Sequence, residues 1–564
     1  MKGCATLMEL SDKLKHKKNK SELCVRILFL MLMFAAAGKI WLIGYDMDEQ
    51  YAYAIAFRLL KGDFFLKEMW EPHQTSAILE ALIMAGYLKL FGSTGIVLFS
   101  RLVGMIIHLS LMFCLYHYLK TRINETYAFV TVGIIAFSIP KLMYTTDFSN
   151  QLMWFELIYI LALSMYYGGE TRKKIYLVIA GISLTLGTLA YPALIVLVPD
   201  SAYTVVRLRK DGKLLIKESI CLATPCFAGL AAFMAILLAK MDFANLCTNL
   251  KLVLKDGSHS ASLTEKLSIN LNSLLTVLIF GIIYLIISLL IWLIFKNKLK
   301  KDIGQIIYIL VTVCFIGQLI IWIFGKEYIN FPRVEMFLAT GFLLAEGITR
   351  KKNEEQTRDF LLFTVVPFAA FIGVSLLTNH PFLVSAPFLS YVLVGLALRT
   401  KKNNGESLQR AQKVCLYASL AIILFGNLFL IRTAGGERNT LIDKGTVIHN
   451  GPAKGVIADY VIAGRIKDDY DLITSAIPEN SKVFYMGYDS DIYMYGNYEV
   501  CSPSTISTPT YNENTLKYFE INKNKKPDFI ICEKVFENEA NELFGEEYEE
   551  MCSNWYIRIL TKKK

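Results

Sequence analysis

Long apolar runs separated by short polar segments fill the sequence between residues 24 and 431. A helix needs about 20 mostly apolar residues to cross the hydrocarbon core of a bilayer, and thirteen runs approach that length. The predicted spans cover residues 24–43, 96–119, 125–142, 151–167, 174–190, 192–206, 218–239, 271–295, 303–324, 333–348, 359–377, 382–399 and 412–431. This pattern predicts an α-helical polytopic membrane protein.

The connecting segments alternate in charge, and this alternation predicts an orientation. The N-terminal segment "KLKHKKNK" is basic, and every second loop after it is rich in Lys and Arg, from "KTR" to "RTKKNNGESLQRAQK". Lys and Arg accumulate in cytoplasmic loops. We therefore expect a multi-pass protein of the cell membrane with a cytoplasmic N-terminus. The acidic stretch 44–95 and the segment after residue 431 would then lie outside the cell.

The pattern changes after the last apolar run. "SKVFYMGY", "PDFIICEK" and "WYIRIL" have the length and the β-branched and aromatic content of strands, and "YNENTLKYFEIN" between the first two is typical of a helix. The sequence therefore predicts two domains, a transmembrane domain over residues 1–431 and a small extracytoplasmic α/β domain over residues 432–564.

Composition narrows the functional classes. Hydrophobic residues make up 54% of the 564 residues and charged residues only 19%, which is typical of a protein that has lipid as part of its solvent. The formal charge of +10 comes from clusters between apolar runs, where basic residues orient spans, so nucleic acid is not an expected partner. No glycine-rich nucleotide fingerprint occurs, and the eleven cysteines contain no CxxC pair. We expect no nucleotide cofactor.

The first outer loop, residues 44–95, is the segment richest in candidate chemistry. Helical spacing of apolar residues predicts two helices that lie in the membrane interface, at 49–60 and 75–92. The carboxylates of the loop include Asp46, Asp48 and Glu49 at its start and Glu71 further on. Asp48 also has the position of an N-cap for a helix that starts at Glu49, so a structural role stays open for it.

Other predicted outer loops carry isolated ionisable residues amid apolar sequence. Asp147 stands where the fourth span begins, His259 lies in the loop "KDGSHSASL", and Lys326 and Arg333 flank the start of the tenth span. Ionisable residues at the membrane are candidates for function by default. Asp147 is equally placed to cap the fourth span, and Arg333 to anchor its span at the interface.

The stretch "DEQYAYAIAFRLLKGDFFLKEMWEPH", residues 48–73, resembles the first outer loop of the GT-C membrane glycosyltransferases. The similar branch contains the protein O-mannosyltransferases and the bacterial aminoarabinose transferases of lipid A. Shared features are an acid pair, an aromatic residue, a surface helix, Gly-Asp, and a Glu before proline. Thirteen spans and an external C-terminal domain also match. The resemblance implies an inverting sugar transfer from a polyprenyl-phosphate donor at the outer face of the membrane.

The resemblance also implies roles for single residues. The catalytic acid of the family falls on Asp48, with Glu49 beside it, and Asp147 matches a second acidic position; Asp46 is an additional carboxylate, so the choice of base stays open. Glu71 matches a loop glutamate that helps to hold a divalent metal in the aminoarabinose enzymes, with His259 in the right loop to be its partner.

The sequence departs from the family after Glu71. Pro72, His73 and Gln74 stand where the family often has Lys-Pro-Pro, so the cation that contacts donor phosphate is unassigned. Lys326, Arg333 and Arg101 are the candidates to replace that lysine, and His73 and Gln74 are expected to line the site.

The chemistry of such a transfer asks for residues of these types. A carboxylate in hydrogen-bond reach of the acceptor hydroxyl gives general-base help of roughly 10²–10⁴-fold. A metal ion or an Arg or Lys side chain stabilises the leaving phosphate.

The acceptor is expected to be a glycan, a lipid or a protein. The alternatives are a transporter or flippase of lipid-linked glycans, a polymerase or ligase of such glycans, and an inactive platform with a transferase fold.

Overall fold

The structure is a computed structural model. It describes residues 2–140, 143–169, 173–209, 211–253, 261–295, 309–317, 320, 333–349, 353–400, 410–429, 431–432, 438–439, 445–506 and 512–563.

The helical part follows the apolar runs of the sequence. Its helices are α1 (Lys2–Leu42), α4 (Ile96–Lys120), α5 (Glu125–Ala136), α6 (Phe148–Gly168), α7 (Ile175–Ala190), α8 (Leu197–Leu208), α9 (Gly212–Lys240), α10 (Phe243–Val253), α11 (Leu263–Phe295), α13 (Arg333–Thr349), α14 (Glu354–Phe360), α15 (Val366–Leu377), α16 (Val392–Thr400) and α17 (Arg410–Phe429). Short helical segments of other geometry are η3 (Pro192–Val196), η4 (Leu361–Val365) and η5 (Phe382–Leu389). The predicted fold class, a helical membrane protein with a small C-terminal α/β domain, is confirmed.

The described helices differ in their capacity to cross a membrane. Five of them are long and apolar enough to do so, at Ser21–Leu42, Ile96–Lys120, Gly212–Lys240, Leu263–Ile294 and Glu354–Leu377, while four others are apolar but shorter. The sixth predicted span, 192–206, consists of η3 followed by α8. It is separated from α7 at Tyr191, which is extended because the residue before a proline avoids the helical conformation. The ninth predicted span lies largely outside the described residues. The count of thirteen spans therefore stays a prediction.

The first outer loop contains the two expected helices, α2 (Met47–Leu60) and α3 (Ala77–Phe91), with η1 (Gln74–Ser76) before α3. The position expected for α2 is wrong. It does not lie on a lipid surface, since every residue from Glu49 to Arg58 is buried. One side of α2 packs on α3, and its other side contacts the C-terminal domain at η6 (Ser490–Met494). In α3, by contrast, Leu82 and Phe91 are exposed.

The C-terminal domain is built on a mixed five-stranded sheet with the order β6-β5-β7-β9-β8. Strands β5 and β7 are parallel, with α19 between them in the chain, so the predicted β–α–β unit is confirmed. Strand β9 runs antiparallel to both β7 and β8. The elements of this part are β1 (Ile431–Arg432), β2 (Arg438–Asn439), β3 (Gly445–Val447), β4 (Ile457–Asp459), α18 (Tyr460–Ala476), β5 (Lys482–Met486), β6 (Glu499–Val500), α19 (Asn512–Ile521), β7 (Phe529–Glu533), α20 (Glu537–Phe544), β8 (Tyr548–Ser553) and β9 (Ile557–Lys562).

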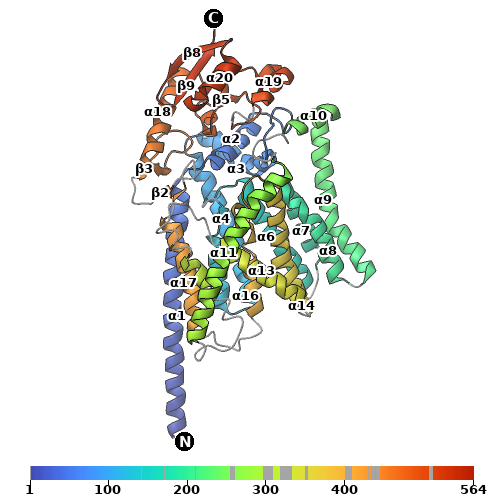
Figure 1. Cartoon of the computed structure of the whole chain (residues 1–564), viewed down its shortest axis with the longest axis vertical. Helices are drawn as coiled ribbons and strands as arrows, with labels where there is room; N and C mark the ends of the chain where they lie inside the picture. Colours follow the sequence, from blue (N-terminus) through green and yellow to red (C-terminus); the bar gives the residue numbers. More distant parts are fainter. Residues whose placement is uncertain are drawn as a thin grey trace.

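Figure 1 shows the C-terminal domain at one end of the helical body, with α2 and α3 between the two and the N-terminus at the opposite end. Backbone hydrogen bonds join the domain to the outer loop and to the start of α4. The Gly44 N–H donates to the carbonyl of Ile457 over 2.9 Å, and the Val97 N–H donates to that of Pro452 over 3.2 Å. One continuous cluster of buried apolar residues includes side chains of α2, α3 and the domain. The domain is therefore packed onto the outer loop.

A glycine lets α4 lie against the segment that leads into α6. A Cβ atom at Gly104 would lie 2.2 Å from the carbonyl oxygen of Tyr144. We expect Gly104→Ala to lower thermal stability, because overpacking of this kind costs about 1–3 kcal/mol and the obstructing atom belongs to the backbone. Thermal unfolding of the purified protein in detergent measures the change.

Gly86→Ala in α3 is the matched control, since a Cβ atom there would meet no atom within 4 Å. Alanine in an exposed helix interior is about 0.5–1 kcal/mol more favourable than glycine, so this variant should melt at the same or a higher temperature. Equal melting of both variants and the wild type would contradict the close approach of α4 to Tyr144.

Candidate functional site

Three acidic residues of the first outer loop surround the start of α2 and have different environments. Asp46 is the N-cap of α2, because its Oδ1 accepts a hydrogen bond of 2.9 Å from the Asp48 N–H, and its side chain is buried. The sequence-based capping role for Asp48 is therefore wrong by two residues: the helix begins at Met47. Asp48 lies in the first turn and is half-buried.

Glu49, the third acid, forms a buried ion pair with Arg101 of α4. Arg101 donates from Nε to Glu49 Oε1 over 2.6 Å and from Nη2 to Oε2 over 2.5 Å, and the Tyr53 hydroxyl donates to the same carboxylate over 2.9 Å. Arg101 also donates to the carbonyls of Trp41 and Gly44. The arginine expected to bind donor phosphate, and the glutamate expected to assist catalysis, thus join α1, α2 and α4 in this structure.

Glu80 of α3 is a further acidic residue of this region that the sequence analysis did not single out. It is buried, and neither carboxylate oxygen accepts a geometrically sound hydrogen bond within the described part of the chain. The pKa of Glu80 is raised to about 8, chiefly by burial. The charges of Glu49 and Asp147 also raise this pKa, whereas the nearby hydroxyl of Ser100 lowers it. The only sequence signal was one carboxylate inside an apolar helix.

Asp147 is the N-cap of α6, as one of the two sequence interpretations proposed. Its Oδ1 accepts a hydrogen bond of 2.9 Å from the Asn150 N–H, and the side chain is buried. Because Asp147 acts electrostatically on Glu80, the start of α6 lies near the acids of α2 and α3. The structure therefore brings together Glu49, Glu80 and Asp147 from three elements.

The residues after Glu71 connect the outer loop to the start of α6. The His73 ring stacks on Phe148, with ring centroids 4.0 Å apart, and contacts Tyr191 at 4.6 Å. Gln74 is buried; its Nε2 donates to the Glu71 carbonyl over 2.9 Å, and its Oε1 accepts from the Leu66 N–H over 2.8 Å. His73 thus lies beside the residue that follows Asp147, whereas Gln74 holds the loop in shape.

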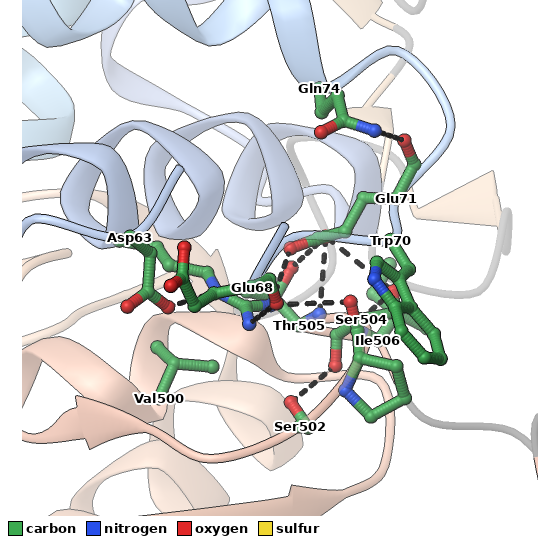
Figure 2. A network of polar contacts seen from close by, with 12 residues as sticks. Asp63, Glu68, Trp70, Glu71, Gln74, Val500, Ser502, Ser504, Thr505 and Ile506 are labelled. Atoms are coloured by element: carbon green, nitrogen blue, oxygen red, sulfur yellow. Dashed lines mark hydrogen bonds and ion pairs between the residues drawn. The ribbon is translucent and has the colours of Figure 1, made fainter. Parts of the chain in front are cut away.

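Glu71 is fully buried in a second cluster, at the contact with the C-terminal domain (Figure 2). Its Oε1 accepts from Arg58 Nη1 over 3.0 Å. Its Oε2 accepts from the backbone N–H of Thr505 over 3.1 Å and from the Thr505 hydroxyl over 2.8 Å, with the Ser504 hydroxyl at 3.4 Å.

This environment does not fit the predicted metal ligand. Both oxygens of Glu71 are engaged by protein donors, and a guanidinium already places a positive charge 3.0 Å from one of them. A divalent ion would have to displace these donors and would be repelled by Arg58. Among the described residues, no three His, Cys, Asp or Glu side chains form a group that could hold a metal.

Three of the sequence-based candidates cannot be placed. His259 and Lys326 lie outside the described residues. Arg333 is the first residue of α13, and its side chain lies outside the described part of the structure. Their roles as metal ligand or phosphate-binding cations stay predictions.

Comparison with known proteins gives a family for part of the chain. Residues 75–238, which run from η1 to the end of α9, match the family of dolichyl-phosphate-mannose-protein mannosyltransferases. Comparison with curated protein sequences gave no match.

Solved structures give weaker likenesses. The archaeal oligosaccharyltransferase AglB from Archaeoglobus fulgidus, solved with an inhibitory peptide and a dolichol-phosphate, has a TM-score of 0.41 and 10% identity; the alignment covers 92% of this chain and 70% of AglB. ArnT from Cupriavidus metallidurans bound to undecaprenyl phosphate has a TM-score of 0.42 and 10% identity, with 96% and 98% covered. These values are too low to support an argument about the site.

The family match covers α3 of the first outer loop, α4, and the start of α6 at Asp147. Glu80 and Asp147 lie within the matched residues, whereas Asp48 and Glu49 of α2 precede them. Over these residues, the match agrees with the resemblance of the sequence to the GT-C membrane glycosyltransferases.

Proposed function

We propose that the protein transfers a sugar from a polyprenyl-phosphate-linked donor to a cell-envelope acceptor at the outer face of the membrane, with inversion at the anomeric carbon. The observation that carries this proposal is the convergence of acidic residues from α2, α3 and the start of α6, where the charges of Glu49 and Asp147 act on Glu80 and Asp48 precedes Glu49 in the first turn of α2. The match to a family named for transfer from dolichyl-phosphate-mannose supports a lipid-linked donor.

Asp48 is the proposed general base. The alternative, Asp46, uses Oδ1 to cap α2 and is only 3% exposed, whereas Asp48 lies in the first turn and is half-buried. A base must come within hydrogen-bond reach of an acceptor hydroxyl that arrives from outside. The more accessible of the two aspartates suits that role.

The leaving phosphate requires a cation that is not already neutralised. Arg58 and Arg101 are each buried against carboxylates, so their charges are compensated within the protein. Lys326 and Arg333 therefore remain the proposed phosphate-binding residues. His73, which stacks on Phe148 beside Asp147, is proposed to form part of the wall next to the base.

The acceptor is proposed to approach from the side of the C-terminal domain. This domain covers α2, and Tyr45 and Gln50, which flank Asp48 in the chain, donate hydrogen bonds to Asp491 and Asp489 of the domain. A glycan, lipid or protein that reaches Asp48 must therefore pass close to the domain. The proposal covers all three acceptor classes, a glycan, a lipid or a protein.

The outward orientation has a direct test. An alkaline phosphatase reporter fused after residue 564 should be active when the C-terminal domain lies outside the cytoplasm, as the positive-inside rule predicts. The matched control is the same reporter after Lys20, before the first span, which should be inactive. Activity of the control fusion, and not of the C-terminal fusion, would invert the proposed topology.

The choice of base has a matched pair of variants. Asp48→Asn should lower the rate of sugar transfer roughly 10²–10⁴-fold, because an amide cannot take the proton. Asp46→Asn should keep most activity, because Asn caps helices about as well as Asp. Transfer of radiolabelled sugar from a polyprenyl-phosphate donor in membranes measures both rates. The reverse ranking would assign the base to Asp46, and full activity of both would remove a base from α2.

The buried Glu80 makes stability depend on pH. Its pKa is about 8 in the folded protein, above the usual 4.5 of the unfolded chain, so between these values the folded state holds a proton that the unfolded state releases. Stability should fall as pH rises from about 5 to 8. In Glu80→Gln this contribution is absent, and at pH 8.5 the variant should exceed the wild type by at least about 1.4 kcal/mol.

Thermal unfolding between pH 5 and 9 gives this difference curve, with Glu542→Gln as the control at an exposed carboxylate of α20. A wild-type curve parallel to that of Glu80→Gln over the whole range would show that Glu80 ionises normally.

A further inference from the structure

We infer that the guanidinium of Arg58 supplies the positive charge at Glu71. The resemblance to metal-dependent transferases puts a divalent ion beside this glutamate instead. Contacts with the C-terminal domain hold Arg58 in this position. The inference concerns how the outer loop is held together. It does not depend on which sugar or acceptor the protein uses.

Every hydrogen-bond donor of Arg58 has an acceptor available within the protein. This side chain is 0% exposed, and a guanidinium has five N–H donors in a fixed geometry. Five acceptors surround it, all of them on the outer loop or on the C-terminal domain. They are the carboxylates of Asp63 and Glu71, the carbonyls of Glu68 and Pro503, and the hydroxyl of Tyr518.

Charge is also compensated within this cluster. Lys525, from the C-terminal domain, donates to Asp63 Oδ1 over 2.5 Å, while Arg58 Nε donates to Asp63 Oδ2 over 2.6 Å. The two cations, Arg58 and Lys525, thus each pair with the buried carboxylates Asp63 or Glu71, and Lys525 also pairs with the partly exposed Glu499 over 3.0 Å. Because the fully buried carboxylates already have these cations, a divalent ion would add two positive charges beside them, in surroundings where an uncompensated charge is costly.

The C-terminal domain supplies further contacts. Thr505 gives two hydrogen bonds to Glu71 Oε2 (Figure 2). The Pro503 carbonyl accepts from both the Trp70 N–H and Arg58. The Trp70 ring contacts Tyr518 edge to face at 5.2 Å. Residues 503–505 and Tyr518 belong to the C-terminal domain, so the shell around Arg58 closes only when the domain is docked.

Two sets of measurements test this inference on the full-length protein in detergent. The first is metal content after incubation with Zn²⁺, Mn²⁺ or Mg²⁺ and desalting, by elemental mass spectrometry. We expect far less than one ion per chain, unchanged in Glu71→Gln. One ion per chain that Glu71→Gln loses would overturn the inference.

The second set is hydrogen exchange of the backbone amides of residues 61–73. Thr505→Ser keeps the hydroxyl that bonds Glu71 and should stay protected, whereas Thr505→Val loses it and should exchange at least ten times faster. Arg58→Lys keeps the charge but not the five donors, and should also exchange faster. Arg58→Lys and Glu71→Gln should not be additive when combined, since they disrupt one contact. Wild-type protection in Thr505→Val and Arg58→Lys would overturn the inference.

Sugar transfer provides a third readout that a purely structural role would not reproduce. If Arg58 positions the Glu71 loop for catalysis, Thr505→Val should lower kcat more than it raises KM, and Thr505→Ser should restore kcat. Loss of transfer in Asp48→Asn with normal exchange at residues 61–73 would concern only the proposed function. Unchanged kcat in Thr505→Val together with faster exchange would contradict a link between this loop and catalysis.

Discussion

The buried guanidinium of Arg58 is the constraint on which the outer half of this protein depends. A charged group without solvent needs both a counter-charge and an acceptor for each donor. Arg58 obtains these from two parts of the chain that are more than 400 residues apart, the outer loop around Asp63 and Glu71 and the domain segments at Pro503 and Tyr518. Separation of the two parts would leave this charge with three of its five partners. The cluster therefore couples the packing of the outer loop to docking of the C-terminal domain.

Helix α2 is held by polar contacts at both ends, and this explains why it is buried. At its start, Tyr45 and Gln50 bond to Asp491 and Asp489 of the domain over 2.7 and 3.3 Å. At its end, Arg58 bonds to the cluster described above. The middle of the helix packs on α3 and on η6 with small and aromatic side chains. Asp48 thus projects from a helix that is fixed by its neighbours, and rigid support of this kind favours a group that must meet a substrate in one geometry.

The sequence predicted the helical class, the two outer-loop helices and the β–α–β unit, because each has a local periodicity that the chain retains when it folds. It placed α2 on a lipid surface, since an amphipathic pattern does not show whether lipid or another domain covers the apolar face. Arg58 and Glu80 were missed for the same reason. Their roles come from partners such as Tyr518 and Asp147, and no spacing along the chain records those contacts.

The charge that remains after these pairings shapes the candidate site. Arg101 is compensated by Glu49, and Arg58 and Lys525 are compensated by Asp63, Glu71 and Glu499. Glu80 is different, because burial, together with the charges of Glu49 and Asp147, raises its pKa to about 8. At neutral pH a proton on Glu80 therefore removes one negative charge from the region where α2, α3 and the start of α6 meet.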